Sequence, residues 1–201
     1  MDYYQVPAAE ACGEMIVKGS RFIASIHRAS DITRAEAIIM NIRQEHPRAS
    51  HTCWAYIAGP PDTTAKGMSD DGEPKGTAGR PMLALLEGSG IGETVGTVTR
   101  YFGGIKLGTG GLMRAYTSTL KETLSSVQLK SIEQMSQTFL TFPYPYCKAI
   151  EQYLETHHCT IDVRSFATDI VFEVSIPKRK EQDLLYQLKQ ISKGQILIQT
   201  K

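Results

Sequence analysis

The chain has 201 residues, of which 41% are hydrophobic and 21% are charged, and its net charge is +1. This composition is typical of globular proteins and excludes the disordered class. No apolar run approaches the roughly 20 residues that a membrane span needs, and the first residues lack the basic and apolar regions of a signal peptide. We therefore expect a cytoplasmic protein with no membrane partner, built from one large or two small domains.

The positions of the cysteines and the balance of charges limit the kinds of site that the chain can carry. The four cysteines, Cys12, Cys53, Cys147 and Cys159, are scattered and form no Cys-x-x-Cys pair, so we expect free thiols rather than a zinc ribbon or a disulfide framework. The 22 basic and 21 acidic residues balance each other, whereas nucleic-acid-binding domains usually carry a basic excess. Any basic surface must therefore come from the arrangement of side chains.

Hydrophobic periodicity predicts alternating strands and helices over the first 130 residues. In chain order we expect strands at 13–18 and 20–27, a helix at 32–42, a strand at 52–58, a helix at 81–88, a strand at 93–102 and a helix at 112–127. Thr33 and Glu36 match a capping box at the start of the first helix. Gly88 is a typical stop signal for the second helix.

The last third of the chain shows a second, complete pattern. A polar stretch at 130–137 indicates a linker. It is followed by a strand at 138–144, a helix at 146–157, strands at 160–166 and 169–176, a helix at 178–191 and a strand at 195–200. This is the ferredoxin-like order. The sequence therefore predicts an α+β protein with an N-terminal domain at 1–132 and a ferredoxin-like C-terminal domain at 137–201.

The glycine-rich run RYFGGIKLGTGG, from Arg100 to Gly111, lies between a predicted strand and a predicted helix. Glycines allow positive φ and close approach of a ligand to the backbone, and a helix N-terminus attracts anions through its free N–H groups. A second glycine-flanked helix start lies beside Arg80. We therefore predict an anion- or nucleic-acid-binding site at Arg100, Gly103, Gly104, Lys106, Gly108, Gly110, Gly111, Arg114 and Arg80.

Two common nucleotide motifs are excluded in this run. A P-loop requires Lys and then Ser or Thr after its last glycine, but Thr109 follows Gly108 directly. A dinucleotide fingerprint that begins at Gly108 needs a glycine at the position of Met113. A glycine-lined turn that serves only close packing between the strand and the helix remains an alternative.

The segment SDDGEPKGTAGRP, at 69–81, contains three nearby carboxylates, those of Asp70, Asp71 and Glu73. Carboxylate oxygens are the ligands that Mg²⁺ prefers, so a magnesium site is one hypothesis. The alternative that we favour is a solvated acidic turn, or carboxylates that cap nearby backbone N–H groups. We expect no obligatory cofactor.

His51 and Cys53 alternate on a predicted strand. A thiolate–imidazole pair would be a nucleophile if a third group oriented the histidine. A buried thiol beside a hydrogen-bonded histidine is the commoner arrangement and the one that we expect here. We therefore assign no catalytic residue.

The strings SDDGEPKGTAGRPML and VTRYFGGIKLGTGGLMRAY closely resemble the core of the IMPACT/YigZ family, and SRFIA and HTCWAYIAG are also similar to it. The resemblance implies an N-terminal domain of the type shared by ribosomal proteins and elongation factor G, with a left-handed βαβ crossover. It also implies a C-terminal domain similar to the last domain of elongation factor G, in agreement with the ferredoxin-like order. For bacterial members it implies a nucleic-acid-binding or translation-associated role.

Three functions stay open at this point. The one that we favour is non-enzymatic binding of RNA or the ribosome, with regulation of translation. The second is a Mg²⁺-dependent enzyme that acts on a nucleotide or a phosphorylated small molecule, with Asp70, Asp71 and Glu73 opposite the glycine run. The third is a protein–protein regulatory module that contacts translation factors.

Overall fold

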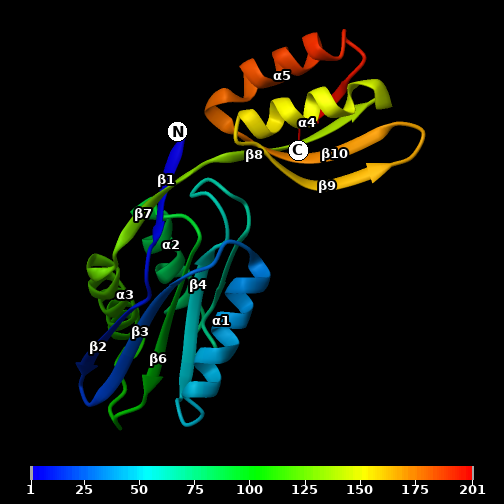
Figure 1. Ribbon diagram of the computed structural model, residues 1–201. Helices are drawn as coiled ribbons and strands as arrows, with labels where there is room; N and C mark the ends of the chain where they lie inside the picture. The colour runs from blue at the N-terminus through cyan, green and yellow to red at the C-terminus, as the bar shows by residue number, and fades with distance from the viewer. Residues whose placement is uncertain (1, 201) are drawn as a thin grey trace. The chain divides into compact units, whose positions relative to one another are not determined.

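The structure, a computed structural model, describes residues 2–200 of the chain. These residues divide into two compact units, one formed by Tyr4–Ile132 and the other by residues 2–3 and 133–200. Each unit combines helices with antiparallel strands, so the predicted α+β class is confirmed (Figure 1). Within residues 2–200, no helix is both long enough and apolar enough to cross a membrane.

A five-stranded antiparallel sheet lies at the centre of the first unit. Its strands follow the order β2 (Ala11–Val17), β3 (Ser20–Arg28), β6 (Thr94–Tyr101), β4 (His51–Ile57) and β5 (Lys66–Ser69). Both β3 and β4 pair with β6 in antiparallel register, so they run parallel to each other on either side of it. Helix α1 (Ile32–Glu45) connects them, which makes a split βαβ arrangement.

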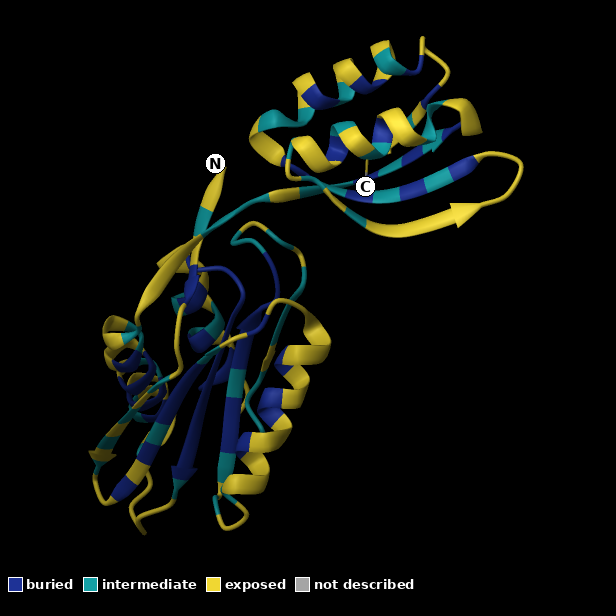
Figure 2. Ribbon diagram, viewed as in Figure 1, coloured by how far each residue is buried: buried dark blue, intermediate teal, exposed yellow. Residues whose placement is uncertain are grey.

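Helices cover both faces of this sheet. The unit has two further helices, α2 (Gly79–Ser89) and α3 (Gly108–Ser126). They pack on one face, where Phe22 and Tyr116 are fully buried, and α1 packs on the other face through residues such as Ile38. Strand β6 is buried along almost its whole length because both of its faces are covered (Figure 2). Burial on both faces accounts for its β-branched composition.

Both α2 and α3 begin at the end of the sheet where β6 ends. Arg100, near the end of β6, pairs with His51, the first residue of β4. Gly79, the first residue of α2, lies against the backbone of Ser69 at the end of β5. Helix α3 follows β6 after the loop at 102–107. This end of the sheet, which we call the glycine-loop end, therefore collects both segments that the sequence singles out.

The second unit has the predicted ferredoxin-like order. Its four-stranded antiparallel sheet runs β11-β8-β10-β9, and α4 and α5 pack against one face of it around a core that includes Phe142 and Phe172. The elements are β8 (Met135–Phe142), α4 (Cys147–Thr156), β9 (Thr160–Phe166), β10 (Ile170–Pro177), α5 (Glu181–Ile191) and β11 (Leu197–Thr200), with 3-10 turns at Tyr144–Tyr146 and Lys178–Lys180.

The predicted linker at 130–137 is wrong, because these residues form strands. Strand β7 (Leu129–Glu133) pairs with β1 (Tyr3–Pro7), and β8 begins at Met135. The residues of β7 are exposed or half-buried, so their polar composition fits an exposed ribbon as well as a linker. Strand β1 is not predicted because its pairing partner lies far along the chain and its five residues show no clear alternation.

Several helix ends also differ from the prediction. Helix α1 is capped by Asp31, whose Oδ1 accepts a hydrogen bond from the N–H of Arg34 at 2.8 Å, rather than by the predicted capping box. Helix α2 continues through Gly88 and ends at Gly90, which has φ 69°. Helix α3 begins at Gly108, so three of the predicted loop glycines lie in its first turn. The polar segment before α2 contains β5, whose four residues are too few to show alternation.

Candidate functional site

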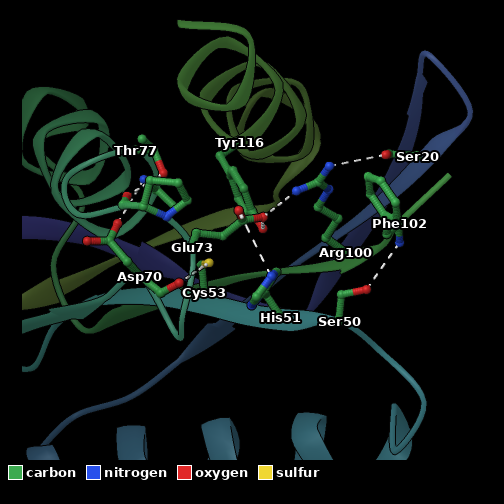
Figure 3. Close-up of polar contacts among 12 residues, drawn as sticks. Ser20, Ser50, His51, Cys53, Asp70, Glu73, Thr77, Arg100, Phe102 and Tyr116 are labelled. Atoms are coloured by element: carbon green, nitrogen blue, oxygen red, sulfur yellow. Dashed lines mark hydrogen bonds and ion pairs between the residues drawn. The ribbon is translucent and has the colours of Figure 1, made fainter. Parts of the chain in front are cut away.

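A buried ion pair lies at the glycine-loop end of the sheet (Figure 3). Arg100 Nη1 donates to Glu73 Oε1 across 2.7 Å, and the two side chains are only 7% and 4% exposed. The hydroxyl of Tyr116 in α3 donates to the same oxygen across 2.8 Å. One carboxylate therefore joins the segment before α2, the end of β6 and helix α3.

Aromatic rings and a hydroxyl hold the rest of the Arg100 side chain. Its guanidinium lies 5.5 Å from the ring centroid of Phe22 and 5.4 Å from that of Phe102. Its Nη2 donates to Ser20 Oγ across 3.3 Å. The sequence predicts an external anion at Arg100, but the structure supplies one of the protein's own carboxylates there and keeps the guanidinium away from the surface.

At the start of α2, too, one of the protein's own carboxylates, that of Asp70, takes the place of the predicted external anion. Its Oδ1 accepts from the backbone N–H groups of Ala78 and Gly79 at 2.9 and 2.8 Å, and its Oδ2 accepts from that of Gly76 at 2.8 Å. Burial alone would raise the pKa of Asp70, but these three donors outweigh it and lower the pKa. The helix start beside the exposed Arg80, predicted as part of an anion site, thus already holds an internal anion.

Asp71 and His51 form the third set of contacts. Asp71 Oδ1 accepts from Arg43 Nη2, and Oδ2 accepts from the N–H of Thr52 at 2.7 Å. His51 Nδ1 lies 2.8 Å from the carbonyl oxygen of Asp71. Because a carbonyl oxygen only accepts, Nδ1 is the donor. The other ring nitrogen, Nε2, then faces Glu73 Oε2 at 4.0 Å.

The three carboxylates proposed as magnesium ligands do not converge in this arrangement. Asp70 binds backbone N–H groups, Asp71 binds an arginine and a backbone N–H, and Glu73 binds Arg100 and Tyr116. Across residues 2–200, no three His, Cys, Asp or Glu side chains are grouped so that they could hold a metal ion. The contacts of Asp70 correspond to the capping role that we expect for these carboxylates.

Cys53 and His51 do not form a catalytic pair. Cys53 Sγ donates to the carbonyl oxygen of Asp70 at 3.0 Å, whereas His51 donates to that of Asp71. Burial raises the pKa of the Cys53 thiol to about 12. The sulfur is therefore protonated at neutral pH and is a poor nucleophile.

The glycines of the run have two different roles. Gly103 packs against Gly19 in the turn between β2 and β3, and a Cβ on Gly103 would lie 1.9 Å from the carbonyl carbon of Gly19. Gly103 therefore serves close packing, which is the alternative role that the sequence leaves open for these glycines. Gly104 and Gly108 instead have positive φ, 85° and 70°, and no atom lies within 4 Å of where their Cβ would be. The backbone is therefore open at Gly104 and at Gly108, the first residue of α3.

Exposed basic side chains surround this open backbone. Lys18, Lys106 and Arg114 are exposed and make no ion pair or side-chain hydrogen bond with any part of residues 2–200. Lys18 and Arg114 line the same hollow of about 200 Å³. Phe102, which begins the loop that carries Lys106, is 51% exposed. We call these four side chains and the open backbone the glycine-loop surface.

Sequence reasoning finds Lys106 and Arg114 but misses Lys18 and Phe102. Lys18 joins the surface only because the turn that carries it packs against Gly103, a contact between segments far apart in the chain. Phe102 lies in the predicted run, but a phenylalanine at the end of a strand is usually expected to be buried. In the structure it is 51% exposed, with the guanidinium of Arg100 5.4 Å from its ring centroid.

We predict that Glu73→Gln lowers the free energy of unfolding by about 3–5 kcal/mol, because it leaves the Arg100 guanidinium buried without a counterion. The double variant E73Q/R100M removes both charges and should recover most of that loss. Denaturant titrations of the three proteins measure both effects. If the single variant is as stable as the wild type, the pair does not hold this end of the sheet together.

Asp70→Asn should cost about 1 kcal/mol at neutral pH, since it removes a charged helix cap. The folded-state pKa of Asp70 lies below its unfolded value near 3.9. Its stabilisation is therefore present above the unfolded pKa and is lost as the pH falls through the folded pKa. The stability difference between variant and wild type should shrink between about pH 5 and pH 2; a constant difference would show that the charge is not responsible.

The thiols should react in an order set by their burial. At about pH 8, iodoacetamide should label the exposed Cys12 and leave Cys53 unlabelled until the protein is unfolded. Peptide mapping by mass spectrometry distinguishes the sites. Labelling of native Cys53 at the rate of Cys12 would contradict the burial and hydrogen bonding described here.

The same end of the sheet lies within the region that comparison with known proteins identifies. The family model of the Impact N-terminal domain matches residues 18–124. The chain is 37% identical to an IMPACT family member of Haemophilus influenzae over an alignment of 200 residues. This alignment covers 99% of this chain and 97% of that protein. It is 36% identical over 197 residues to the IMPACT family member YigZ of Escherichia coli, and that alignment covers 98% of this chain and 97% of YigZ.

A solved structure agrees with these sequence matches. A crystal structure of a hypothetical protein superposes with a TM-score of 0.82 at 36% sequence identity and covers 98% of this chain and 97% of its own. Both the fold and the motifs of the glycine-loop end are thus found in a region shared with named family members. The chain therefore belongs to the IMPACT family.

Proposed function

We propose that this protein binds RNA through the glycine-loop surface, on the ribosome or a ribosomal RNA segment, and acts in translation without catalysing a reaction. The observation that carries the proposal is the set of unpaired cations, Lys18, Lys106 and Arg114, around open glycine backbone. Basic side chains and free backbone N–H groups are the usual partners of RNA phosphates.

The start of α3 favours an external anion more than the start of α2 does. Helix α3 has no side-chain cap and no acidic residue in its first turn. Its first N–H groups and its positive dipole end are therefore not neutralised by the helix itself. At α2 the same groups are occupied by Asp70. Only one of the two helix starts is thus available to phosphate.

Phe102 supports RNA as the ligand rather than a simple anion. Phe102 is 51% exposed, and the guanidinium of Arg100 lies 5.4 Å from the centroid of its ring. An unpaired base can stack on an exposed aromatic ring, and each such contact contributes about 1–3 kcal/mol. Proteins that bind single-stranded RNA commonly combine exposed aromatic rings with basic side chains.

The enzyme hypothesis has weaker support. It requires Asp70, Asp71 and Glu73 to present free oxygen atoms to Mg²⁺, and each of these carboxylates accepts hydrogen bonds from different groups of the protein. The relatives named above are described as family members, and their names state no activity. We therefore propose the binding function alone.

The proposal predicts a modest salt dependence. Three cations that contact a single strand give a slope of about −2 when the logarithm of the binding constant is plotted against that of salt concentration. Fluorescence anisotropy with single-stranded RNA, and co-sedimentation with ribosomal subunits, measure it from about 50 to 200 mM salt. The variant K106A/R114A should bind more weakly and with a slope of less than about 1 in magnitude.

Two variants serve as comparisons in that experiment. The control K148A/K189A removes two exposed lysines of the second unit, makes the same change in net charge and should bind like the wild type. Phe102→Ala should weaken binding without changing the slope, because it removes stacking and no charge. Equal affinities for wild type and K106A/R114A would overturn the proposal.

A further inference from the structure

A second group of basic side chains lies at the opposite end of the same sheet. Arg28, the last residue of β3, pairs with Thr94, the first residue of β6, whereas the glycine loop follows the end of β6. Arg28, Arg34 and Lys130 line a pocket of about 320 Å³, together with the chain at 7–10. Arg28 and Arg34 also line a neighbouring hollow of about 430 Å³. None of these residues belongs to the glycine-loop surface.

A buried carboxylate fixes the orientation of Arg28. Glu93 is 7% exposed; its Oε2 accepts from Arg28 Nε at 2.7 Å, and its Oε1 accepts from the hydroxyl of Tyr4 at 2.7 Å. The backbone of Glu93 is held as well, since its N–H donates to the carbonyl of Gly59 and its carbonyl accepts from the N–H of Ala29. The guanidinium is thus positioned before any ligand arrives.

The backbone of Glu93 has a conformation that must be supported by its surroundings. Its φ is 47°, in the left-handed region that glutamate rarely adopts. Such strain persists where the surrounding structure demands it, and it concentrates at functional sites. Here the strained residue holds Arg28 at the wall of a pocket.

Most N–H groups of the three basic side chains in the pocket have no hydrogen-bond acceptor in the described chain. Within residues 2–200, Arg28 makes side-chain contacts through Nε only, so both of its terminal nitrogens lack a hydrogen-bond acceptor. Arg34 and Lys130 make no side-chain hydrogen bond or ion pair with the described chain. Four N–H donors of Arg28, five of Arg34 and three of Lys130, twelve in all, therefore have no partner in the described chain.

Three carboxylates lie near these cations: Glu93 forms the ion pair with Arg28, Glu10 lines the pocket and Asp31 lines the neighbouring hollow. Glu10 lies 3.4 Å from His27 Nδ1 and is 73% exposed on the side chain. Asp31 accepts from the N–H of Arg34, which is the cap of α1, and from the hydroxyl of Ser30 at 2.9 Å. Within residues 2–200, neither Glu10 nor Asp31 forms an ion pair with Arg28, Arg34 or Lys130. The pocket is lined by three positive charges and one negative charge, and the Glu93 carboxylate pairs with Arg28, so an excess of one positive charge remains.

These features select a class of ligand. A guanidinium binds a phosphate group through two parallel hydrogen bonds, and a lysine adds a point charge. The volume of about 320 Å³ is at the small end of ligand sites. Its lining residues, all in the described chain, include no Phe, Tyr or Trp on which a base could stack. We propose that Arg28, Arg34 and Lys130 bind a compact phosphorylated small molecule that carries at least two negative charges.

Calorimetric titration of the full chain with inorganic pyrophosphate and with inorganic phosphate tests this proposal. Pyrophosphate should bind saturably and more tightly than phosphate. The variant R34A/K130A changes two side chains that make no hydrogen bond or ion pair within residues 2–200, so it should fold normally and weaken pyrophosphate binding by about tenfold or more. The matched control K148A/K189A, which makes the same change in net charge in the second unit, should bind pyrophosphate like the wild type.

The outcomes separate this pocket from the proposed RNA surface. Absence of saturable pyrophosphate binding, or binding that is lost in K106A/R114A and kept in R34A/K130A, would overturn the pocket proposal and leave the RNA proposal standing. Pyrophosphate binding that depends on Arg34 and Lys130 supports the pocket even if no RNA binds. If R34A/K130A weakens RNA binding while pyrophosphate does not bind, the pocket is an RNA contact and the small-molecule proposal is wrong.

Discussion

The arrangement of the glycine-loop end depends on one buried ion pair, that between Glu73 and Arg100. A buried pair is stable only when further hydrogen bonds compensate the loss of water, and here Tyr116 and Ser20 provide them. Ser20 also accepts from the N–H of Gly103 at 3.1 Å. The hydroxyl of Ser20 thus holds both Arg100 and Gly103. The ion pair between Glu73 and Arg100 therefore helps to fix the position of the glycine loop.

Net charge gives a misleading picture of this molecule. The charge of +1 is an even balance, but the acidic residues at this end lie inside the fold or in its turns and are engaged with donors, as with Asp70, Asp71 and Glu73. The exposed cations around the loop have no such partners. A neutral composition can therefore produce a positive surface when one sign of charge is used internally.

The sequence is sufficient to predict the second unit and the chief elements of the first, because their hydrophobic periods are long and regular. It fails at β1, β5 and β7, which are short or exposed and depend on distant pairing partners. It locates the glycine run correctly between β6 and α3. It misplaces Arg100, since no local pattern shows that a carboxylate 27 residues earlier will be folded against it.

The pairing of β1 with β7 has a consequence for synthesis of the chain. The five strands of the central sheet lie between residues 11 and 101, so they can pair as soon as that segment has left the ribosome. Strand β1 emerges first but has to wait for residues 129–133. During translation β1 can bridge to Ile91 early, but its pairing with β7 is the last strand pairing of the first unit to form, when the second unit begins to emerge.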